Sequence, residues 1–237
     1  MTDKFLQHFR KKAANLIDGK LAKTGTVLEV RKWEPSTIIE VDLHLPQTVM
    51  DDWNEVPYMK CKVDDLTYRD YTPSGWDAET QTCTLFIDAG HAGPGSRWAQ
   101  QLQKGDKISY LGTNSTRQTP SSTSAVICLG DESSIGHLLA MQQLTLPQTR
   151  FSGAIIIDND QNRSLFKQFF KSPLQPIPRT DVCGHHSLTE WLLEQTCSIQ
   201  NTLFYIVGNS HMVTQMRKLL RKQGYQSNQI KCQGFWS

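Results

Sequence analysis

The sequence lacks any long apolar run, and this absence excludes a membrane-spanning helix. No stretch of the 237 residues approaches the roughly 18 apolar residues that a transmembrane helix needs. The amino-terminal segment MTDKFLQHFRKK also lacks the apolar core of a secretory signal peptide. We therefore expect a cytoplasmic protein with no stable membrane insertion.

An excess of charge of one sign is also missing. The 25 Lys and Arg residues face 23 Asp and Glu residues, which leaves a formal charge of +2. This charge is too small for the broad basic field that attracts nucleic acid, so we expect no nucleic-acid partner. Basic residues gather at 10–12 and at Arg217–Lys222, and we interpret both clusters as solvated helix faces.

The six cysteines lack the close spacing of a metal motif. None pairs with another at C-x-x-C spacing, which excludes a plant-type iron–sulfur cluster on this chain. In a cytosolic chain we expect the thiols to remain reduced. The segment CGHH contains Cys183, His185 and His186, but no second ligand cluster accompanies it, and we predict no metal site.

The order of strand-like and helix-like segments changes near residue 115. Upstream, after an expected amino-terminal helix, turn residues separate β-prone runs such as TGTVLEVRKW and TCTLFIDAG, as in an antiparallel barrel. Downstream, apolar strands alternate with amphipathic helices, which implies a parallel sheet with helices on both faces. We predict a helix and β-barrel over 1–115, a linker over 116–124 and an α/β domain over 125–237. Within the α/β domain, Ser187 with Glu190 three residues later predicts a helix start at Ser187.

Two glycine-containing loops follow strands of the predicted α/β domain. In LGDESSIG, Gly130 follows a strand and a helix opens at Ser133 or Ser134, while VGNSHM offers Gly208 and Asn209 in the same context. Glycine lets a ligand approach the backbone and a helix start offers free N–H groups, so both loops suit a phosphate. Ordinary Ser-capped strand-to-helix turns would have the same sequence pattern.

The segment YRDYTPS places Arg69, Tyr71 and Thr72 close together in a β-prone run. Strand alternation puts Arg69 and Tyr71 on one face and Thr72 on the other. Further along, GPGSRWAQQ predicts a short helix at whose start Gly95 and Ser96 would present N–H groups to a phosphate. Without other motifs, an edge strand with an exposed Arg–Tyr pair would explain the first segment.

Taken together, these motifs resemble the siderophore-interacting protein family, a branch of the ferredoxin-reductase-like flavoproteins. The family shows R-x-Y-T, then G-P-x-S-x-W-A followed by G-D, then G-D-E-[ST], and this chain has YRDYTPS, GPGSRWA and GDESS in that order. The final QIKCQGFWS resembles the family's closing G-Y-W, with Phe235 in place of tyrosine. The resemblance spans residues 25–236. It implies an FAD-binding β-barrel followed by an NAD(P)-binding-like α/β domain.

The resemblance also implies roles for individual residues. Tyr71 would pack on the isoalloxazine ring, Arg69 would reach the pyrophosphate, and Thr72 would hydrogen-bond near the reactive edge as the catalytic candidate. The candidate cofactor-binding residues are Arg69, Tyr71, Thr72, Ser74, Gly90, His91, Gly93, Gly95, Ser96, Trp98, Gly130, Asp131, Glu132, Ser133, Gly208 and Trp236. The candidates for a basic patch that attracts anionic ferric chelates are Lys60, Lys62 and Arg97.

This sequence departs from the family's pattern at several positions. Relatives carry His-Gly four residues before the Gly-Pro, whereas here His91 comes two positions after that offset. Relatives commonly end the last strand of the parallel sheet in Gly-Glu, where this chain has Gly208 and Asn209. Many relatives continue beyond the closing aromatic residue into a basic helix that helps to hold the substrate. Here the sequence stops one residue after Trp236, so we do not carry that part of the site over.

On this resemblance we predict a flavin-dependent ferric-siderophore reductase that acts as a monomer. Electrons would pass from NADH, NADPH or ferredoxin through FAD to siderophore-bound Fe(III), and Fe(II) would be released because siderophores bind it weakly. Asp158 could bind the ribose 2′-OH of NADH, Arg163 could take the 2′-phosphate of NADPH, and Trp236 would gate access of the nicotinamide. The alternatives are a general NAD(P)H–flavin or ferredoxin reductase and a non-catalytic flavin- or nucleotide-binding module.

Overall fold

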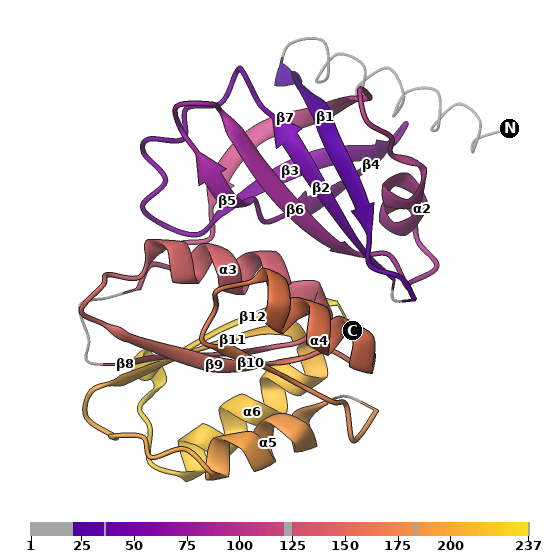
Figure 1. The fold of residues 1–237 in the computed structure, drawn as a ribbon. Coiled ribbons are helices and arrows are strands. Elements are labelled where there is room, and N and C mark those ends of the chain that lie inside the picture. Colours follow the sequence, from indigo (N-terminus) through magenta and orange to yellow (C-terminus); the bar gives the residue numbers. More distant parts are fainter. Residues whose placement is uncertain (1–20, 36, 121–124, 183, 237) are drawn as a thin grey trace, which may run out of the picture. The chain divides into compact units, whose positions relative to one another are not determined.

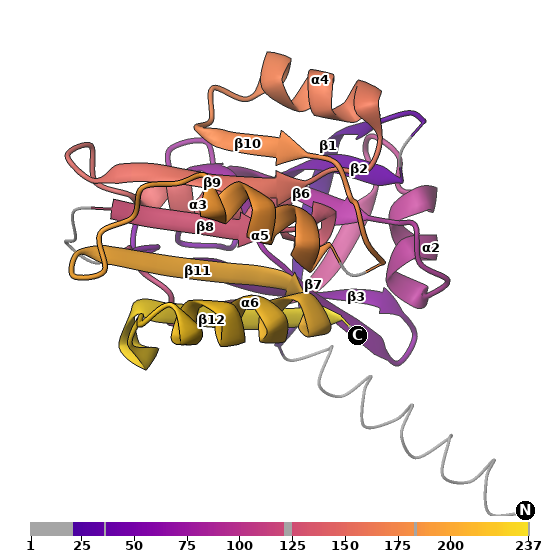
Figure 2. The ribbon, with the colours of Figure 1, turned by 90° about the horizontal axis from the view of Figure 1, so that it is seen from below.

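The computed structural model describes residues 21–35, 37–120, 125–182 and 184–236. These residues form two compact units, which are drawn in Figures 1 and 2. The first unit contains 21–32, 37–53 and 57–116, and the second contains most of the chain after residue 116 together with two short earlier segments. The expected amino-terminal helix, the basic cluster at 10–12 and Cys183 lie outside the described residues.

The first unit is built on a seven-stranded antiparallel sheet. The strands are β1 (Lys23–Lys32), β2 (Ile38–His44), β3 (Pro57–Asp64), β4 (Thr67–Tyr71), β5 (Ser74–Asp77), β6 (Thr82–Asp88) and β7 (Lys107–Ser115). They pair in the order β4-β3-β7-β1-β2-β6-β5. The edge strand β4 also contacts β6 near the opposite edge, so the sheet curls back on itself. The predicted antiparallel β fold of the amino-terminal part is confirmed.

Alternating side chains give the first unit its core. Along β3, Met59 and Cys61 are buried, whereas Lys60 and Lys62, which alternate with them, are partly exposed. This is the period-two pattern of a strand with one face inside. Helix α2 (Pro94–Gln101) packs against β3 and β4. It begins at a proline, whose fixed φ suits the first turn of a helix.

The second unit is built on a five-stranded parallel sheet. Its strands β8 (Ala125–Gly130), β9 (Arg150–Ile156), β10 (Leu174–Ile177), β11 (Thr202–Asn209) and β12 (Ile230–Trp236) lie in the order β10-β9-β8-β11-β12. The helices are η1 (Glu132–Ser134), α3 (Ile135–Leu144), α4 (Asp160–Phe169), α5 (His185–Leu193), α6 (Ser210–Lys222) and η2 (Ser227–Gln229). Helices α3 and α4 lie on one face and α5 and α6 on the other (Figures 1 and 2). The predicted α/β part is therefore confirmed.

One predicted helix start is wrong. The N-cap of helix α5 is Gly184, three residues before the predicted cap Ser187, and the helix begins at His185. Gly184 adopts a left-handed φ of 75° at this turn into the helix. A side chain at 184 would also overlap Ile156, since a β-carbon there would lie 2.2 Å from its Cδ1. Ser187 lies inside the helix, where its hydroxyl accepts the backbone N–H of Thr180 at 2.9 Å.

Among the helices that the structure describes, none is long and apolar enough to cross a membrane.

Candidate functional site

The first candidate site lies in the β unit, where β4 meets the start of α2. Tyr71 and Trp98 stack with ring centroids 5.6 Å apart and planes inclined by 19°. A β-carbon placed on Gly95 would lie 2.7 Å from the Tyr71 hydroxyl oxygen and 3.3 Å from Arg69 Cγ. A larger residue at 95 would therefore have to displace the Tyr71 and Arg69 side chains from the start of α2. We call Arg69, Tyr71, Gly95 and Trp98 the β4–α2 cluster.

The polar groups of the β4–α2 cluster form few hydrogen bonds with the described part of the protein. Arg69 is exposed and donates one hydrogen bond, from Nη1 to the carbonyl of Tyr68 at 2.8 Å. Burial of the Tyr71 ring raises the pKa of its hydroxyl, so Tyr71 stays neutral at physiological pH. The start of α2 adds Ser96, which is buried, and Gly93, next to which a β-carbon would meet nothing within 4 Å. An extended anionic cofactor fits this combination of an exposed guanidinium, an aromatic face and a glycine-rich helix start.

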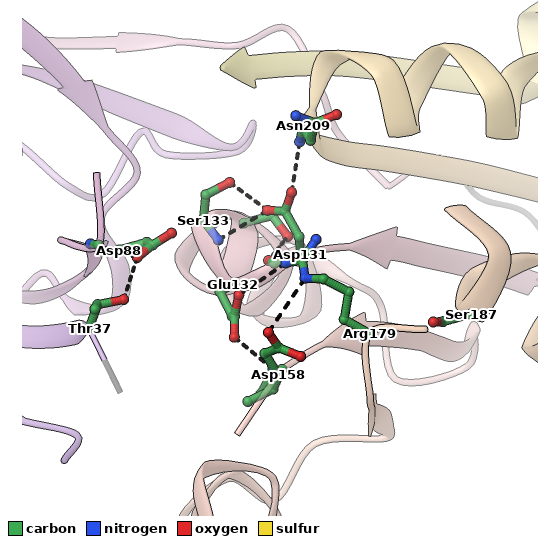
Figure 3. Close-up of polar contacts among 12 residues, drawn as sticks. Thr37, Asp88, Asp131, Glu132, Ser133, Asp158, Arg179, Ser187 and Asn209 are labelled. Carbon is green, nitrogen blue, oxygen red and sulfur yellow. Dashed lines mark hydrogen bonds and ion pairs between the residues drawn. The ribbon is translucent and has the colours of Figure 1, made fainter. Parts of the chain in front are cut away.

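The other candidates of the β unit are more firmly engaged. Ser74 is buried and its hydroxyl donates to the carbonyl of Thr84 at 3.2 Å, whereas Thr72 follows β4 and is half-buried. The Asp88 carboxylate accepts the N–H of Gly90 at 3.0 Å and contacts His91 Nε2 at 3.2 Å. Asp88 also accepts the hydroxyl hydrogen of Thr37 (Figure 3). The turn that carries Gly90 and His91 is thus held by a neighbouring carboxylate.

The three candidates for a basic patch differ in how open their charges are to solvent. Lys60 forms an ion pair with Asp70 at 2.8 Å, and both side chains are about half exposed, so its charge is compensated locally. Lys62 is half-buried on the same strand, two residues further along. Arg97 lies exposed on α2, next to the cluster residue Trp98. Of the three candidates, Arg97 has the charge most open to solvent.

The second candidate site is the carboxyl edge of the parallel sheet. Asp131 follows β8 and is almost completely buried. Its Oδ1 accepts the N–H and the hydroxyl of Ser133 at 3.1 and 2.5 Å, and its Oδ2 accepts the N–H of Asn209 at 2.8 Å (Figure 3). Burial raises the pKa of Asp131, and the bonds from Ser133 and Asn209 act against this rise. One carboxylate therefore fastens the loop after β8 to the loop after β11.

Gly130 and Gly208 are required by the protein's own packing. A β-carbon at 130 would lie 2.1 Å from the Ser134 hydroxyl oxygen. Gly208 has a φ of 130°, and a β-carbon there would lie 2.6 Å from the Asp131 carboxylate. Neighbouring side chains use the space that each glycine leaves, and the approach of a ligand to these loops stays a prediction.

An ion-pair network that the sequence analysis missed lies next to Asp131. Glu132 accepts the N–H of Asp158 at 2.7 Å and contacts Arg179 at 3.2 Å, and Arg179 lies 3.9 Å from the Asp158 carboxylate (Figure 3). The guanidinium of Arg163 donates to the carbonyls of Ile157 and Asp158, both at 2.6 Å, and forms an ion pair with Asp160. The sequence could have indicated Arg179, because this residue follows β10 by two positions and so lies at the same edge of the sheet as the glycine loops.

The carboxyl-terminal segment contacts the loop after β8 and the start of α3. The indole N–H of Trp236 donates to the Ser133 hydroxyl oxygen at 3.1 Å, and the Phe235 ring lies 5.8 Å from the ring of His137. His137, which no sequence motif indicated, is buried, and its Nε2 donates to the side-chain oxygen of Gln118 at 2.8 Å. Gln118 in turn bonds to Gln233 of β12 at 3.3 Å. The side chains of Ser133, His137 and Gln118 thus contact the end of β12.

The histidines of the CGHH segment belong to helix α5. His185 contacts the Asp181 carboxylate through Nδ1 at 2.8 Å, and its ring lies 6.2 Å from that of His211. Within 21–35, 37–120, 125–182 and 184–236, no group of His, Cys, Asp and Glu side chains is arranged to hold a metal ion.

Two family models match the chain over consecutive regions. A siderophore-interacting FAD-binding domain matches residues 34–116, which include the β4–α2 cluster. A siderophore-interacting protein model matches residues 123–237, which include the carboxyl edge of the parallel sheet. Among curated protein sequences, none matches the chain.

Solved structures share the fold at low sequence identity. The siderophore-interacting protein of Acinetobacter baumannii is 13% identical with a TM-score of 0.75, over 91% of this chain and 90% of that chain. The siderophore-interacting protein of Aeromonas hydrophila is 15% identical with a TM-score of 0.71, over 91% of each chain. A ferredoxin NADP+ reductase from Neisseria gonorrhoeae with bound FAD and NADP is 16% identical with a TM-score of 0.70, over 90% of this chain and 98% of that chain.

Proposed function

Because this chain belongs to the siderophore-interacting protein family, we propose that it is a flavin-dependent reductase of ferric siderophores. The observation that carries the proposal is the β4–α2 cluster, in which Gly95 lets a helix start lie against Arg69 and Tyr71. An exposed guanidinium next to a glycine-rich helix start suits a pyrophosphate, and an adjacent aromatic ring suits a planar ring system. These features support FAD as the cofactor rather than FMN, which has no pyrophosphate.

The chain's own residues would bind and orient the cofactor. Arg69 and the N–H groups at Gly95 and Ser96 would hold the phosphates, and Tyr71 would pack on the ring in place of its present partner Trp98. Thr72 would donate a hydrogen bond near the reactive edge. When bound, FAD would supply the redox chemistry, taking a hydride and passing its electrons on singly to Fe(III).

A nicotinamide nucleotide is proposed to bind at the carboxyl edge of the parallel sheet, where such folds bind nucleotides. The loops after β8 and β11 would contribute the backbone at Gly130, Ser133 and Gly208, while Asp131, Glu132 and the Ser133 hydroxyl would hold the loops in place. Asp158 leaves 63% of its side chain exposed, so it remains available to a ribose hydroxyl, which favours NADH. The guanidinium of Arg163 is occupied by backbone carbonyls, which argues against a 2′-phosphate contact there. Ferredoxin remains a second candidate donor.

The ferric chelate would be the substrate rather than a resident group. Fe(III) would be reduced to Fe(II), which siderophores bind weakly, so reduction would release the iron. Arg97, with Lys62 and Lys60 as lesser contributors, would attract anionic chelates to the β unit. We further propose that the chain works as a cytoplasmic monomer, with domains over 1–115 and 125–237 joined by a linker over 116–124.

The proposal is tested with the purified chain loaded with flavin. The flavin released by heat is identified by chromatography, and recovery of FMN alone would contradict the FAD assignment. Reduction is then followed anaerobically with NADH, NADPH or reduced ferredoxin as the donor and a ferric catecholate or ferric hydroxamate siderophore as the acceptor, with a colorimetric Fe(II) chelator as the trap. Turnover on ferredoxin and dyes without turnover on ferric chelates would favour a general reductase. A chain that binds no flavin would favour the binding-module alternative.

A further inference from the structure

The Ser133 hydroxyl lies between the carboxyl-terminal Trp236 and the buried Asp131. Its oxygen is 3.1 Å from the indole nitrogen of Trp236 and 2.5 Å from Oδ1 of Asp131. Trp236 is half-buried, and Asp131 is almost completely buried. A single hydroxyl therefore connects the end of the chain to the interior of the loop after β8.

The direction of both hydrogen bonds follows from the chemistry of the groups. An indole N–H can only donate, so the Ser133 oxygen must accept from Trp236. The Ser133 hydroxyl in turn donates its hydrogen to Oδ1 of Asp131, whose oxygen accepts it. Because Asp131 polarises this hydroxyl, the oxygen becomes a better acceptor for the indole. The two bonds thus support each other, and a rotation of the hydroxyl would weaken both.

The position of Ser133 is itself fixed by the loops around it. Asp131 also accepts the N–H of Ser133, while its second oxygen holds the N–H of Asn209 at the start of α6. Gly208 packs directly on the Asp131 carboxylate. Both loops that follow β8 and β11 are therefore tied to the same carboxylate, and through Ser133 to the indole.

We propose that Ser133 is a positioning residue that fixes the Trp236 side chain against the loop after β8, and so couples that loop to the carboxyl-terminal aromatic residue. This inference rests on the proposed function in one respect, since it assumes that the position of Trp236 controls the reaction with the nicotinamide nucleotide. Loss of the hydroxyl removes the Ser133 acceptor from the indole N–H. The contacts of Phe235 with His137 and of Gln233 with Gln118 keep the rest of β12 in place.

The contact is tested in the flavin-free chain by following the indole N–H resonances in a nitrogen–proton correlation spectrum. The Trp236→Phe variant identifies the Trp236 resonance by its loss. In Ser133→Ala, this resonance should move upfield and exchange faster with water, and Ser133→Thr should restore it. Ser187→Ala is the matched control, because it removes a buried hydroxyl of the same unit that contacts neither Asp131 nor Trp236. A Trp236 resonance that does not respond to Ser133→Ala would overturn the proposal.

The functional consequence is tested in the flavin-loaded chain by stopped-flow reduction with NADH and NADPH. Ser133→Ala should change the reduction rate in the same direction as Trp236→Ala, and the double variant should show no further change beyond Trp236→Ala. Additive effects of the two substitutions would overturn the coupling. Failure to load flavin would instead overturn the proposed function, and the resonance test would still decide the role of Ser133.

Discussion

The two candidate sites are held together by different physical means. The β4–α2 cluster depends on packing: two stacked rings and a glycine whose missing side chain admits its neighbours. The carboxyl edge of the parallel sheet depends on a closed polar network, in which both oxygens of the buried Asp131 accept hydrogen bonds. Within the described part of the chain, the Arg69 side chain donates one hydrogen bond, to a backbone carbonyl, whereas the Asp131 side chain accepts three. Residues that looked equivalent as cofactor contacts thus divide into groups open to a ligand and groups that hold the loops.

The largest effect is expected from breaking the polar network. Asp131→Ala leaves the buried N–H of Asn209 and the Ser133 hydroxyl without their acceptor, which should cost about 3 kcal/mol of unfolding free energy. Asp131→Asn keeps one acceptor oxygen and should cost less. Hydrogen exchange of the β8 and β11 amides measures the change. Unaltered exchange at these strands would show that the network does not stabilise the α/β unit.

The corresponding substitution in the β unit, at Arg69, should weaken flavin binding rather than lower the stability of the fold. Arg69→Ala removes an exposed side chain that makes one backbone hydrogen bond, so the unfolding free energy should change by less than about 0.5 kcal/mol. A lost phosphate partner should weaken flavin binding by about 1.5–3 kcal/mol, or roughly 10- to 150-fold. Flavin content and calorimetric affinity provide the measurement. Arg150→Ala, which removes an exposed arginine at the start of β9, is the control, and a full flavin load in Arg69→Ala would contradict the assignment.

Lowering the pH should reduce the stability of the α/β unit through His137. Burial lowers the pKa of His137 to about 3, whereas an unfolded histidine has a pKa near about 6.5. Between these values the unfolded chain binds more protons, so the stability contributed by neutral His137 is complete above about pH 6.5 and is lost as the pH falls. From pH 7 to pH 5 the α/β unit should lose about 2 kcal/mol. Segment-resolved hydrogen exchange measures this loss, and His137→Leu should remove this part of the pH slope. An equal slope in the variant would exclude His137 as the cause.

The smallest effect is expected at Trp236. Its indole donates a hydrogen bond to Ser133, and stacking of an aromatic ring contributes about 0.5–1.5 kcal/mol beyond the buried area. If this residue gates the nicotinamide, Trp236→Ala should speed reduction of the flavin by NAD(P)H roughly 2- to 10-fold, with little change in melting temperature. Stopped-flow absorbance measures the rate. A loss of several kcal/mol of stability with unaltered kinetics would identify Trp236 as a core residue without a gating role.

Much of the fold could be read from residue order, because strand and helix periodicities are local properties. The change from alternating β-prone runs to apolar strands separated by helices predicted an antiparallel and then a parallel sheet, and both are present. The start of α5 could not be read in this way, because the Ser187–Glu190 spacing fits a cap, while the left-handed Gly184 starts the helix earlier. A local capping pattern does not predict which glycine adopts the left-handed conformation that precedes a helix.

The sequence by itself determined the class of each unit and the motifs that lie at one end of their strands, since both depend on residues within a few positions of each other. The tertiary structure alone decided which side chains meet. It placed Gly95 against Tyr71, Gly208 against Asp131, Arg179 against Glu132 and Trp236 against Ser133. These partners are far apart along the chain, and their contacts depend on strand order and on burial, which no local pattern of residues encodes.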